Sequence, residues 1–111
     1  MAEVAALLDR LLDGDVVDGT DLARVLGTSP RSVARWHSAR SVPRRASEER
    51  LLELKTVVDL LRGTLREQPA RLWLRSPNPD LGYEKPLDLV ARGEYQRVID
   101  SILALAEGVT A

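Results

Sequence analysis

The sequence predicts an all-α protein, on three observations. Its apolar residues recur at helical spacing, no segment alternates with the period of a strand, and prolines and glycines stand where helices begin and end. Leu, Val and Ala dominate the 44% hydrophobic content, which suits helices better than strands. We expect two joined helical modules, an N-terminal one at residues 1–65 and a C-terminal one at residues 66–111.

An amphipathic helix opens the chain. Its apolar residues follow the spacing i, i+3, i+4, i+7 and i+8, which makes one buried stripe: Val4, Leu7, Leu8, Leu11 and Leu12. Asp13-Gly14-Asp15 then ends the helix.

Two short helices come next. Thr20 is a good N-cap for the first, and Gly27 suits the residue after its end, where φ is commonly positive. Ser29 caps the second helix, at about residues 30–38, which has proline at its first position. The spacing is that of a helix-turn-helix, and residues 21–36 resemble that motif closely.

The second of these helices has two faces. Val33 and Trp36 should pack inward together with His37, whereas Arg31, Ser32 and Arg35 share the other face. That face would enter the major groove of DNA, where arginine can pair with guanine O6 and N7. The alternative is ordinary solvent exposure.

Basic residues concentrate around this motif. Residues 21–50 hold seven Arg against three acidic residues, a net charge of +4 in a chain whose net charge is −1. Three of these arginines lie in the loop around Pro43, where phosphate contacts are expected. The candidate DNA-binding residues are Ser29, Arg31, Ser32, Arg35, Arg40, Arg44 and Arg45.

A longer helix follows, capped by Ser47. Its apolar residues between Leu51 and Leu65 cover a broad arc, which should pack on the helix-turn-helix and also on the C-terminal module or a second copy. Gly63 should weaken the helix. We expect a symmetric homo-oligomer, because such motifs usually read two half-sites, with this arc as the place of self-association.

The C-terminal part contains three shorter helices. Pro69 suits the first position of a helix that carries Trp73, and Pro86 that of a single-turn helix ended by Gly93. A last helix spans about residues 94–106. Prolines shape the loop from Ser76 to Tyr83 into a non-helical segment.

Four ordered motifs in this part resemble a known family. They are Trp73-Leu74, the Pro-Asn-Pro-Asp-Leu-Gly run at residues 77–82, the Lys-Pro-Leu-Asp-Leu-Val run at 85–90, and the Gly-Glu-Tyr-Gln-Arg-Val-Ile-Asp run at 93–100. Together they resemble the toxin-binding domain of MbcA/ParS/Xre antitoxins, in which a helix-turn-helix precedes this domain. The resemblance implies a RES-domain toxin as partner, one that consumes NAD, and an antitoxin domain that denies NAD its pocket.

The resemblance also implies a toxin-binding surface in this half of the chain. Prolines lower the ordering cost of a loop on binding, and Tyr83 is a rigid aromatic anchor. Lys85 could meet an acidic group, and the tail from residue 107 could reach into a cleft. The alternatives are a structural connector for the loop and a frayed end for the tail. The candidate toxin-binding residues are Trp73, Asn78, Pro79, Leu81, Gly82, Tyr83, Lys85, Gly108, Val109, Thr110 and Ala111.

The inventory of reactive side chains argues against an enzyme. The chain has one His, no Cys and no glycine-rich phosphate loop, so we expect neither a metal site nor a cofactor. The absence of Cys suits a reducing compartment. The early residues include Glu3 and Asp9 and no basic start before a long apolar run. We therefore expect no signal peptide, no membrane span and a cytoplasmic location.

Three functions remain open from the sequence. The first is an antitoxin that binds a RES-domain toxin and represses its own operon through operator DNA. The second is a helix-turn-helix repressor whose C-terminal half only mediates oligomerisation. The third is an interaction protein whose helix-turn-helix no longer binds DNA.

Overall fold

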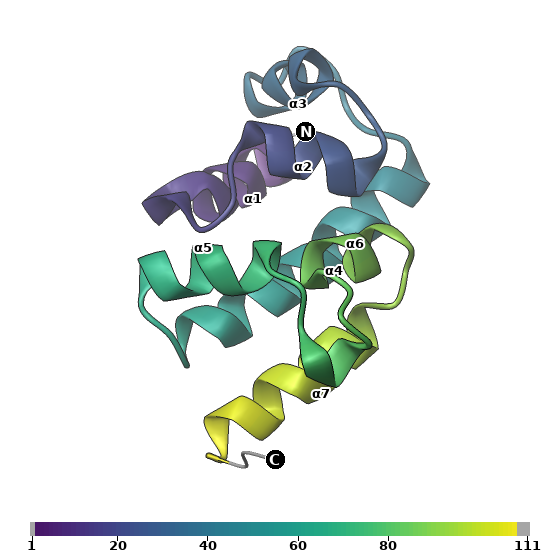
Figure 1. Cartoon of the computed structure of the whole chain (residues 1–111). Helices are drawn as coiled ribbons and strands as arrows, with labels where there is room; N and C mark the ends of the chain where they lie inside the picture. The colour runs from purple at the N-terminus through teal and green to yellow at the C-terminus, as the bar shows by residue number, and fades with distance from the viewer. Residues whose placement is uncertain (1, 109–111) are drawn as a thin grey trace.

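A computed structural model describes residues 2–108, and within that range helices joined by loops make up the fold and there is no strand, which confirms the predicted fold class. One end of the molecule contains α1–α3, the other contains α7, and α4 runs between them (Figure 1). The elements in chain order are α1 (Ala2–Leu12), the 3-10 turn η1 (Asp13–Asp15), α2 (Gly19–Leu26), α3 (Pro30–His37), α4 (Arg45–Arg62), α5 (Glu67–Arg75), the 3-10 turn η2 (Pro79–Leu81), α6 (Pro86–Ala91) and α7 (Tyr95–Ala106).

Several predicted helix starts are wrong by two or three residues. Asp18, not Thr20, caps α2, because the Asp18 carboxylate accepts from the Asp21 N–H while the Asp21 carboxylate accepts from the Asp18 N–H. The helix α4 begins at Arg45, so Ser47 lies inside its first turn. The helix α5 begins at Glu67, which puts Pro69 at its third position, where the missing N–H is still not needed.

Other boundaries agree with the sequence. Ser29 caps α3, and its Oγ accepts from the Ser32 N–H at 3.1 Å. Gly27 ends α2 in the left-handed region at φ 66°. Pro86 is the first residue of α6, and α4 ends directly before Gly63.

The core lies around α4. Its inward residues are all 0% exposed and include Leu51, Leu54, Val57, Val58 and Leu61. The helices α1, α2, α5, α6 and α7 all contact α4. The chain itself therefore covers the arc on which self-association was expected, and that location is wrong. Leu52, off the arc's centre, remains 50% exposed.

The predicted boundary between residues 65 and 66 lies within a continuous core. One hydrophobic cluster contains residues from both sides, and α2 packs against α6. The division into two modules stays a prediction. In the range 2–108, none of the helices combines the length and the apolar character that a membrane span requires.

Candidate functional site

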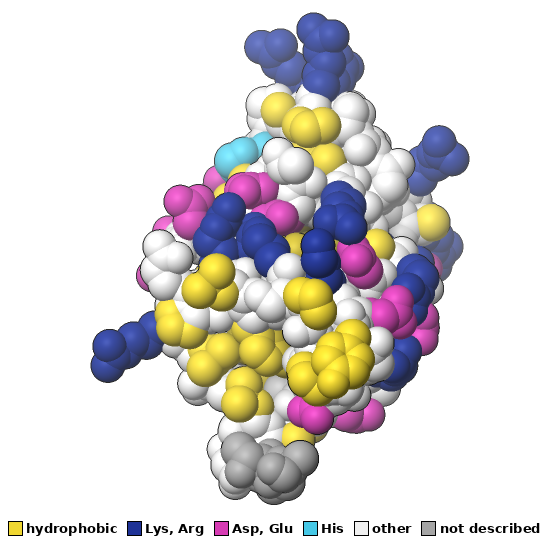
Figure 2. Space-filling view, in the orientation of Figure 1, with side chains coloured by type: hydrophobic (Ala, Val, Ile, Leu, Met, Phe, Trp, Pro, Cys, Tyr) yellow, Lys and Arg dark blue, Asp and Glu magenta, His cyan; other side chains and the backbone are white. Residues whose placement is uncertain are grey.

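The helix α3 presents a basic face. Arg31 and Arg35 are exposed on it, while Val33 and Trp36 are buried on the opposite side, as predicted. Figure 2 shows Lys and Arg side chains protruding from the end of the molecule at which Figure 1 places α3. Ser32 is half-buried, and its hydroxyl lies 3.2 Å from that of Ser29, so both serines are engaged at the start of the helix.

His37 ties α3 to the first helix. Its ring, which was expected to pack inward, is half-buried, and its Nε2 contacts the carboxylate of Asp9 on α1. This contact helps to fix α3 on α1, against which it packs.

The segment between α3 and α4 extends the basic surface. Arg40 and Arg44 are exposed in it, and Ala39 turns the chain with φ 61°. Arg45 is also exposed, but it is the first residue of α4 and not part of the loop, and it pairs with Glu49 at 3.7 Å. All the arginines predicted to contact DNA are thus accessible.

Two arginines of α5 attach the C-terminal half to the start of α2. Arg71 donates to the Asp15 carbonyl at 2.7 Å and to Asp18 Oδ2 at 3.0 Å. Arg75 donates to the Val16 carbonyl at 3.1 Å and pairs with the Asp21 carboxylate. These are the same carboxylates that cap α2, so α5 stabilises the helix that precedes the basic helix α3.

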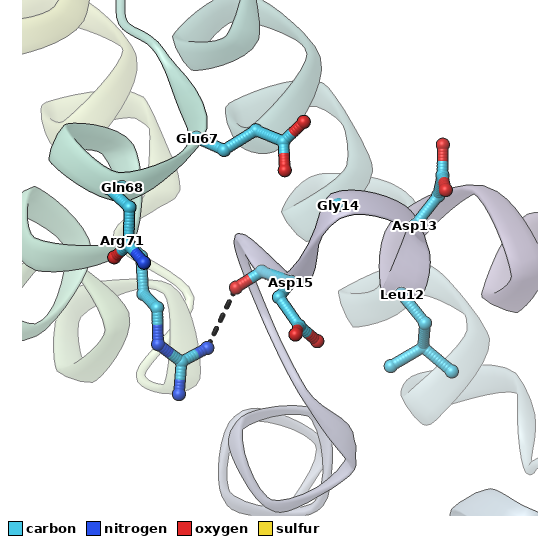
Figure 3. A pocket seen from close by; sticks show the side chains of 7 residues that line it. All are labelled: Leu12, Asp13, Gly14, Asp15, Glu67, Gln68 and Arg71. Atoms are coloured by element: carbon cyan, nitrogen blue, oxygen red, sulfur yellow. Dashed lines mark hydrogen bonds between the residues drawn. The ribbon is translucent and has the colours of Figure 1, made fainter.

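A pocket of about 400 Å³ lies beside this junction, between η1 and the start of α5 (Figure 3). Arg71 reaches from α5 to the Asp15 carbonyl, and Glu67 lies over Gly14. Gly14 has φ 77°, a backbone conformation that favours glycine at this turn. The described residues contain no group of three or more His, Asp or Glu side chains arranged to hold a metal ion.

The loop between α5 and α6 is held in one shape by its own backbone. The Asn78 carbonyl accepts from the Tyr83 N–H at 2.8 Å, and the Asn78 N–H donates to the Glu84 carbonyl at 3.1 Å. The Asn78 side chain caps η2 by accepting from the Asp80 N–H at 2.9 Å. Gly82 and Tyr83 both have positive φ, so the chain turns sharply there and Tyr83 projects outward.

Arg92 clamps the far end of this loop. Its guanidinium donates to both carboxylate oxygens of Glu84, at 2.5 and 2.8 Å, and to Glu94 at 2.9 Å. The hydrogen bonds from Arg92 lower the pKa of Glu84 and, together with those from Arg97, the pKa of Glu94, while the pKa of Arg92 is raised. These ion pairs attach Glu84, the residue after Tyr83, to the turn between α6 and α7.

The candidate toxin-binding residues do not all share one environment. Leu81 is only 3% exposed and belongs to the core, so its assignment as a contact is wrong; it anchors the loop instead. Trp73 is half-buried against the core. Pro79, Gly82, Tyr83, Lys85 and Gly108 are exposed, and Asn78 is half-buried. Val109, Thr110 and Ala111 lie outside the described residues.

An exposed apolar surface accompanies Tyr83. Within residues 2–108, the most exposed large hydrophobic side chains of this half are Leu72 of α5, Tyr83 and Leu103 of α7, with exposed fractions of 64%, 72% and 47%. Figure 2 shows hydrophobic side chains gathered over the half of the visible face where Figure 1 places α5 and α7. We call these three residues the apolar surface.

The exposure of Leu72 and of Leu103 was not predicted from the sequence. Leu72 could have been found from helical geometry, because Ala70 and Leu74 are one turn apart on the buried side and Leu72 falls on the opposite face. Leu103 lies four residues after the buried Ile99, so helical spacing alone predicts that it is buried and gives no sign of its exposure.

The family described as the antitoxin Xre/MbcA/ParS C-terminal toxin-binding domain matches residues 58–108. The chain is 48% identical over 96 residues to the mycobacterial cidal antitoxin MbcA of Mycobacterium tuberculosis and of Mycobacterium bovis, which covers 86% of this chain and 77% of MbcA. The chain belongs to the Xre/MbcA/ParS antitoxin family.

Two further relatives match this chain over nearly its whole length. A probable mycobacterial cidal antitoxin of M. tuberculosis is 29% identical over 114 residues, covering 95% of this chain and 97% of that protein. The crystal structure of the M. tuberculosis MbcT–MbcA toxin–antitoxin complex contains a chain that superposes with a TM-score of 0.87 at 40% identity, with 96% of each chain covered. These relatives are antitoxins and not enzymes, in agreement with the expectation from the side-chain inventory.

Proposed function

We propose that this chain is the antitoxin of a toxin–antitoxin pair. Its partner is a RES-domain toxin that consumes NAD, and the antitoxin inhibits it by covering the toxin's NAD pocket. The observation that carries the proposal is the 48% identity to MbcA across 86% of the chain, together with the 40% identical chain in the MbcT–MbcA complex.

The toxin-contacting part is assigned to the apolar surface and the loop that presents it. An exposed aromatic ring on a loop fixed by Asn78 and Arg92 needs little further ordering on binding. Tyr83, at 72% the most exposed large hydrophobic residue within residues 2–108, is the central anchor. The residue set consists of Leu72, Trp73, Asn78, Pro79, Gly82, Tyr83, Lys85 and Leu103, with Gly108 and the tail to Ala111 as a second contact.

We also assign a DNA-binding activity to the basic surface, which consists of α3 and the segment after it. Through this surface the chain binds operator DNA and represses its own operon. Arg31 and Arg35 face outward from a capped helix whose other side is buried, which is the arrangement that major-groove recognition requires. Arg40, Arg44 and Arg45 supply phosphate contacts.

Two experiments test these assignments separately. Co-expression of a tagged RES-domain toxin from a neighbouring gene with the wild-type chain should yield a stable complex, and Tyr83→Ala should reduce its yield. Removing residues 107–111 tests the tail in the same assay. A gel-shift titration with the chain's own promoter tests DNA binding. Failure of the chain to bind such a toxin contradicts the antitoxin proposal and leaves the DNA assignment standing.

A further inference from the structure

Ser47, in the first turn of α4, follows two arginines. Arg44 and Arg45 stand three and two residues before it, and no other Ser or Thr of the chain has basic residues at both of these positions. A protein kinase with carboxylates in its peptide groove selects such a segment, because each arginine pairs with a carboxylate while the hydroxyl reaches the nucleotide. The segment therefore has the chemistry of a phosphate acceptor.

The Ser47 hydroxyl is free to react. Its side chain is half-buried, and no hydrogen bond within residues 2–108 engages its Oγ. Thr56, further along α4, differs in this respect, because its hydroxyl donates to the Leu52 carbonyl at 3.1 Å.

The start of α4 is held only weakly by side chains. No side chain caps the helix at Arg44. Among the described residues, the one ion pair of this first turn joins Arg45 to Glu49 at 3.7 Å, and both side chains are exposed. The turn can therefore unwind at low cost and present Ser47 on an extended segment.

A pocket of about 200 Å³ faces Ser47 between α2, the start of α4 and α6, and its lining includes Arg24 and Arg50. Arg50 stands three residues after Ser47, so the two side chains are neighbours on the helix surface. Arg24 pairs with Asp88 at 2.6 Å and Arg50 with Glu53 at 3.0 Å. A phosphate dianion on Ser47 presents more charge than either carboxylate, and the pocket exceeds the roughly 30 Å³ share of one water molecule several times.

The two glutamates after Ser47 lie away from this pocket. Glu48 lines a groove on the α1 side of α4, and Glu49 is exposed and pairs with Arg45. A phosphate on Ser47 therefore faces guanidinium groups and the free N–H groups at the start of α4, both of which favour negative charge.

We propose that Ser47 is phosphorylated by a protein kinase selective for arginine before the acceptor, and that the phosphoserine weakens DNA binding. In this step the Ser47 oxygen bonds to the γ-phosphorus of ATP, the bond from that phosphorus to the β,γ-bridging oxygen breaks, and ADP leaves with the bridging oxygen. The hydroxyl proton passes to a carboxylate of the kinase.

The effect on DNA rests on the DNA binding proposed above. Residues 21–50 have a net charge of +4, and a phosphoserine adds about −2, which leaves about +2. Arg44 and Arg45, both assigned to phosphate contacts, directly precede the modified turn, so the added charge repels the DNA backbone there. Toxin inhibition should not change, because Ser47 lies outside the apolar surface and the loop that presents Tyr83.

The acceptor is tested with the full chain, ATP and the catalytic subunit of a kinase selective for arginine two and three residues before the acceptor. Mass spectrometry should locate phosphate on Ser47, and Ser47→Ala should take up none. Replacing Arg44 and Arg45 together with Ala should slow the reaction at least about tenfold. Ser41, half-buried and preceded by Arg40 alone, is the internal control and should stay unmodified. The chain isolated from its own host should carry the same phosphate.

The pocket is tested by phosphorus NMR of the chain with phosphoserine encoded at position 47. The second pKa of a phosphoserine is ordinarily about 6, and the arginines should lower it. Arg50→Gln should return this pKa toward its ordinary value. A pKa that Arg50→Gln leaves unchanged would contradict the arrangement of the pocket.

DNA affinity is measured with the same protein and the chain's own promoter at about 0.1 M salt. Phosphoserine at position 47 should raise the Kd at least about tenfold and lower the salt slope by about 2. Ser47→Ala should bind like the wild type. Phosphoserine at position 101, on α7, adds the same charge away from the basic surface and should change the Kd little. NAD consumption by the toxin should be inhibited equally by the modified and unmodified chains.

Three results would overturn the proposal. One is a chain that takes up no phosphate at Ser47 in the kinase reaction or in its host. Another is modification that is equally fast without Arg44 and Arg45. The third is a phosphoserine chain that binds the promoter as tightly as the unmodified chain. An unmodified chain that binds no DNA contradicts the proposed DNA binding instead, and the kinase and NMR results then decide on the acceptor site alone.

Discussion

Arg71 on α5 donates a hydrogen bond to the Asp18 carboxylate at 3.0 Å, and Asp18 is the N-cap of α2. Arg75 makes the parallel contact to Asp21, the other member of the capping box. A second link joins the last turn of α2 to α6, where Arg24 pairs with Asp88 at 2.6 Å. The helix that precedes the basic face is therefore attached at both ends to elements of the C-terminal half.

Replacing Arg75 with Met should destabilise the fold. The change removes a charged donor from the half-buried Asp21 carboxylate and from the Val16 carbonyl, and we expect a loss of about 1–2 kcal/mol. Urea denaturation followed by circular dichroism measures it. Arg66→Met, an exposed arginine that no hydrogen bond or ion pair of the described residues engages through its side chain, is the control and should change little. Equal losses in both variants would refute the role given to Arg75.

The clamp on the loop should weaken in acid. Hydrogen bonds from Arg92 lower the pKa of Glu84 below its ordinary value of 4.5. A carboxylate whose pKa is lowered on folding contributes stability that is complete above its unfolded pKa and is lost as the pH falls through the folded pKa. The free energy of unfolding of the wild type should therefore exceed that of Glu84→Gln by a constant amount above about pH 5, and the difference should shrink below about pH 4.

Denaturation curves between pH 3 and pH 7 supply this measurement. Arg92→Gln removes the clamp from its other end and should lose this part of the pH dependence together with the part that Arg92 contributes at Glu94. The double variant should lose no more than Arg92→Gln alone. A difference between wild type and Glu84→Gln that is unchanged at pH 3 would contradict the clamp.

Local sequence signals predicted the helices but not their contacts. Caps and helical spacing identified each helix, and the burial of Val33 and Trp36 followed from their spacing alone. The start of α2 was misplaced because Asp18 and Thr20 are both good caps, and the pairing of Asp18 with Asp21 three residues later in a capping box was overlooked. The contacts of these carboxylates with Arg71 and Arg75, which lie far away in the sequence, carry no local signal.

Arg35→Ala should weaken specific DNA binding. Loss of a bidentate guanine contact should cost about 1–3 kcal/mol and relax base preference at one position of each half-site. A gel-shift titration with the chain's own promoter and with random DNA measures both effects, and Arg66→Ala serves as an arginine control outside the basic surface. If Arg35→Ala keeps wild-type affinity and preference, α3 does not read bases through this residue.

Arg44→Ala should weaken DNA binding without changing sequence preference. A phosphate contact carries no sequence information, so binding should weaken equally for all sequences and the salt slope should fall by about 1. Binding measured over a series of salt concentrations gives the slope for the wild type, the variant and Arg66→Ala. An unchanged slope for Arg44→Ala would remove this residue from the phosphate-contacting set.

The candidate toxin-binding site was predicted only in part. The prolines and Tyr83 marked an ordered loop, and the motifs of the antitoxin family marked the segment as functional. Leu81 was wrongly assigned because its exposure depends on how η2 packs against α7, which the local sequence does not reveal. The clamp by Arg92 was missed because Glu84 and Arg92 stand on opposite sides of α6 in the sequence. They meet only because the chain folds back there, which the local sequence does not reveal.

The most direct test of the central claim is NAD consumption by a purified RES-domain toxin from a neighbouring gene, measured with increasing amounts of this chain. The wild type should abolish NAD loss near equimolar amounts. Tyr83→Ala should inhibit about 30-fold less tightly, and Tyr83→Asn should do the same while keeping a residue that tolerates positive φ. Arg35→Ala should inhibit like the wild type. Undiminished NAD loss at a large excess of the wild-type chain would contradict the account.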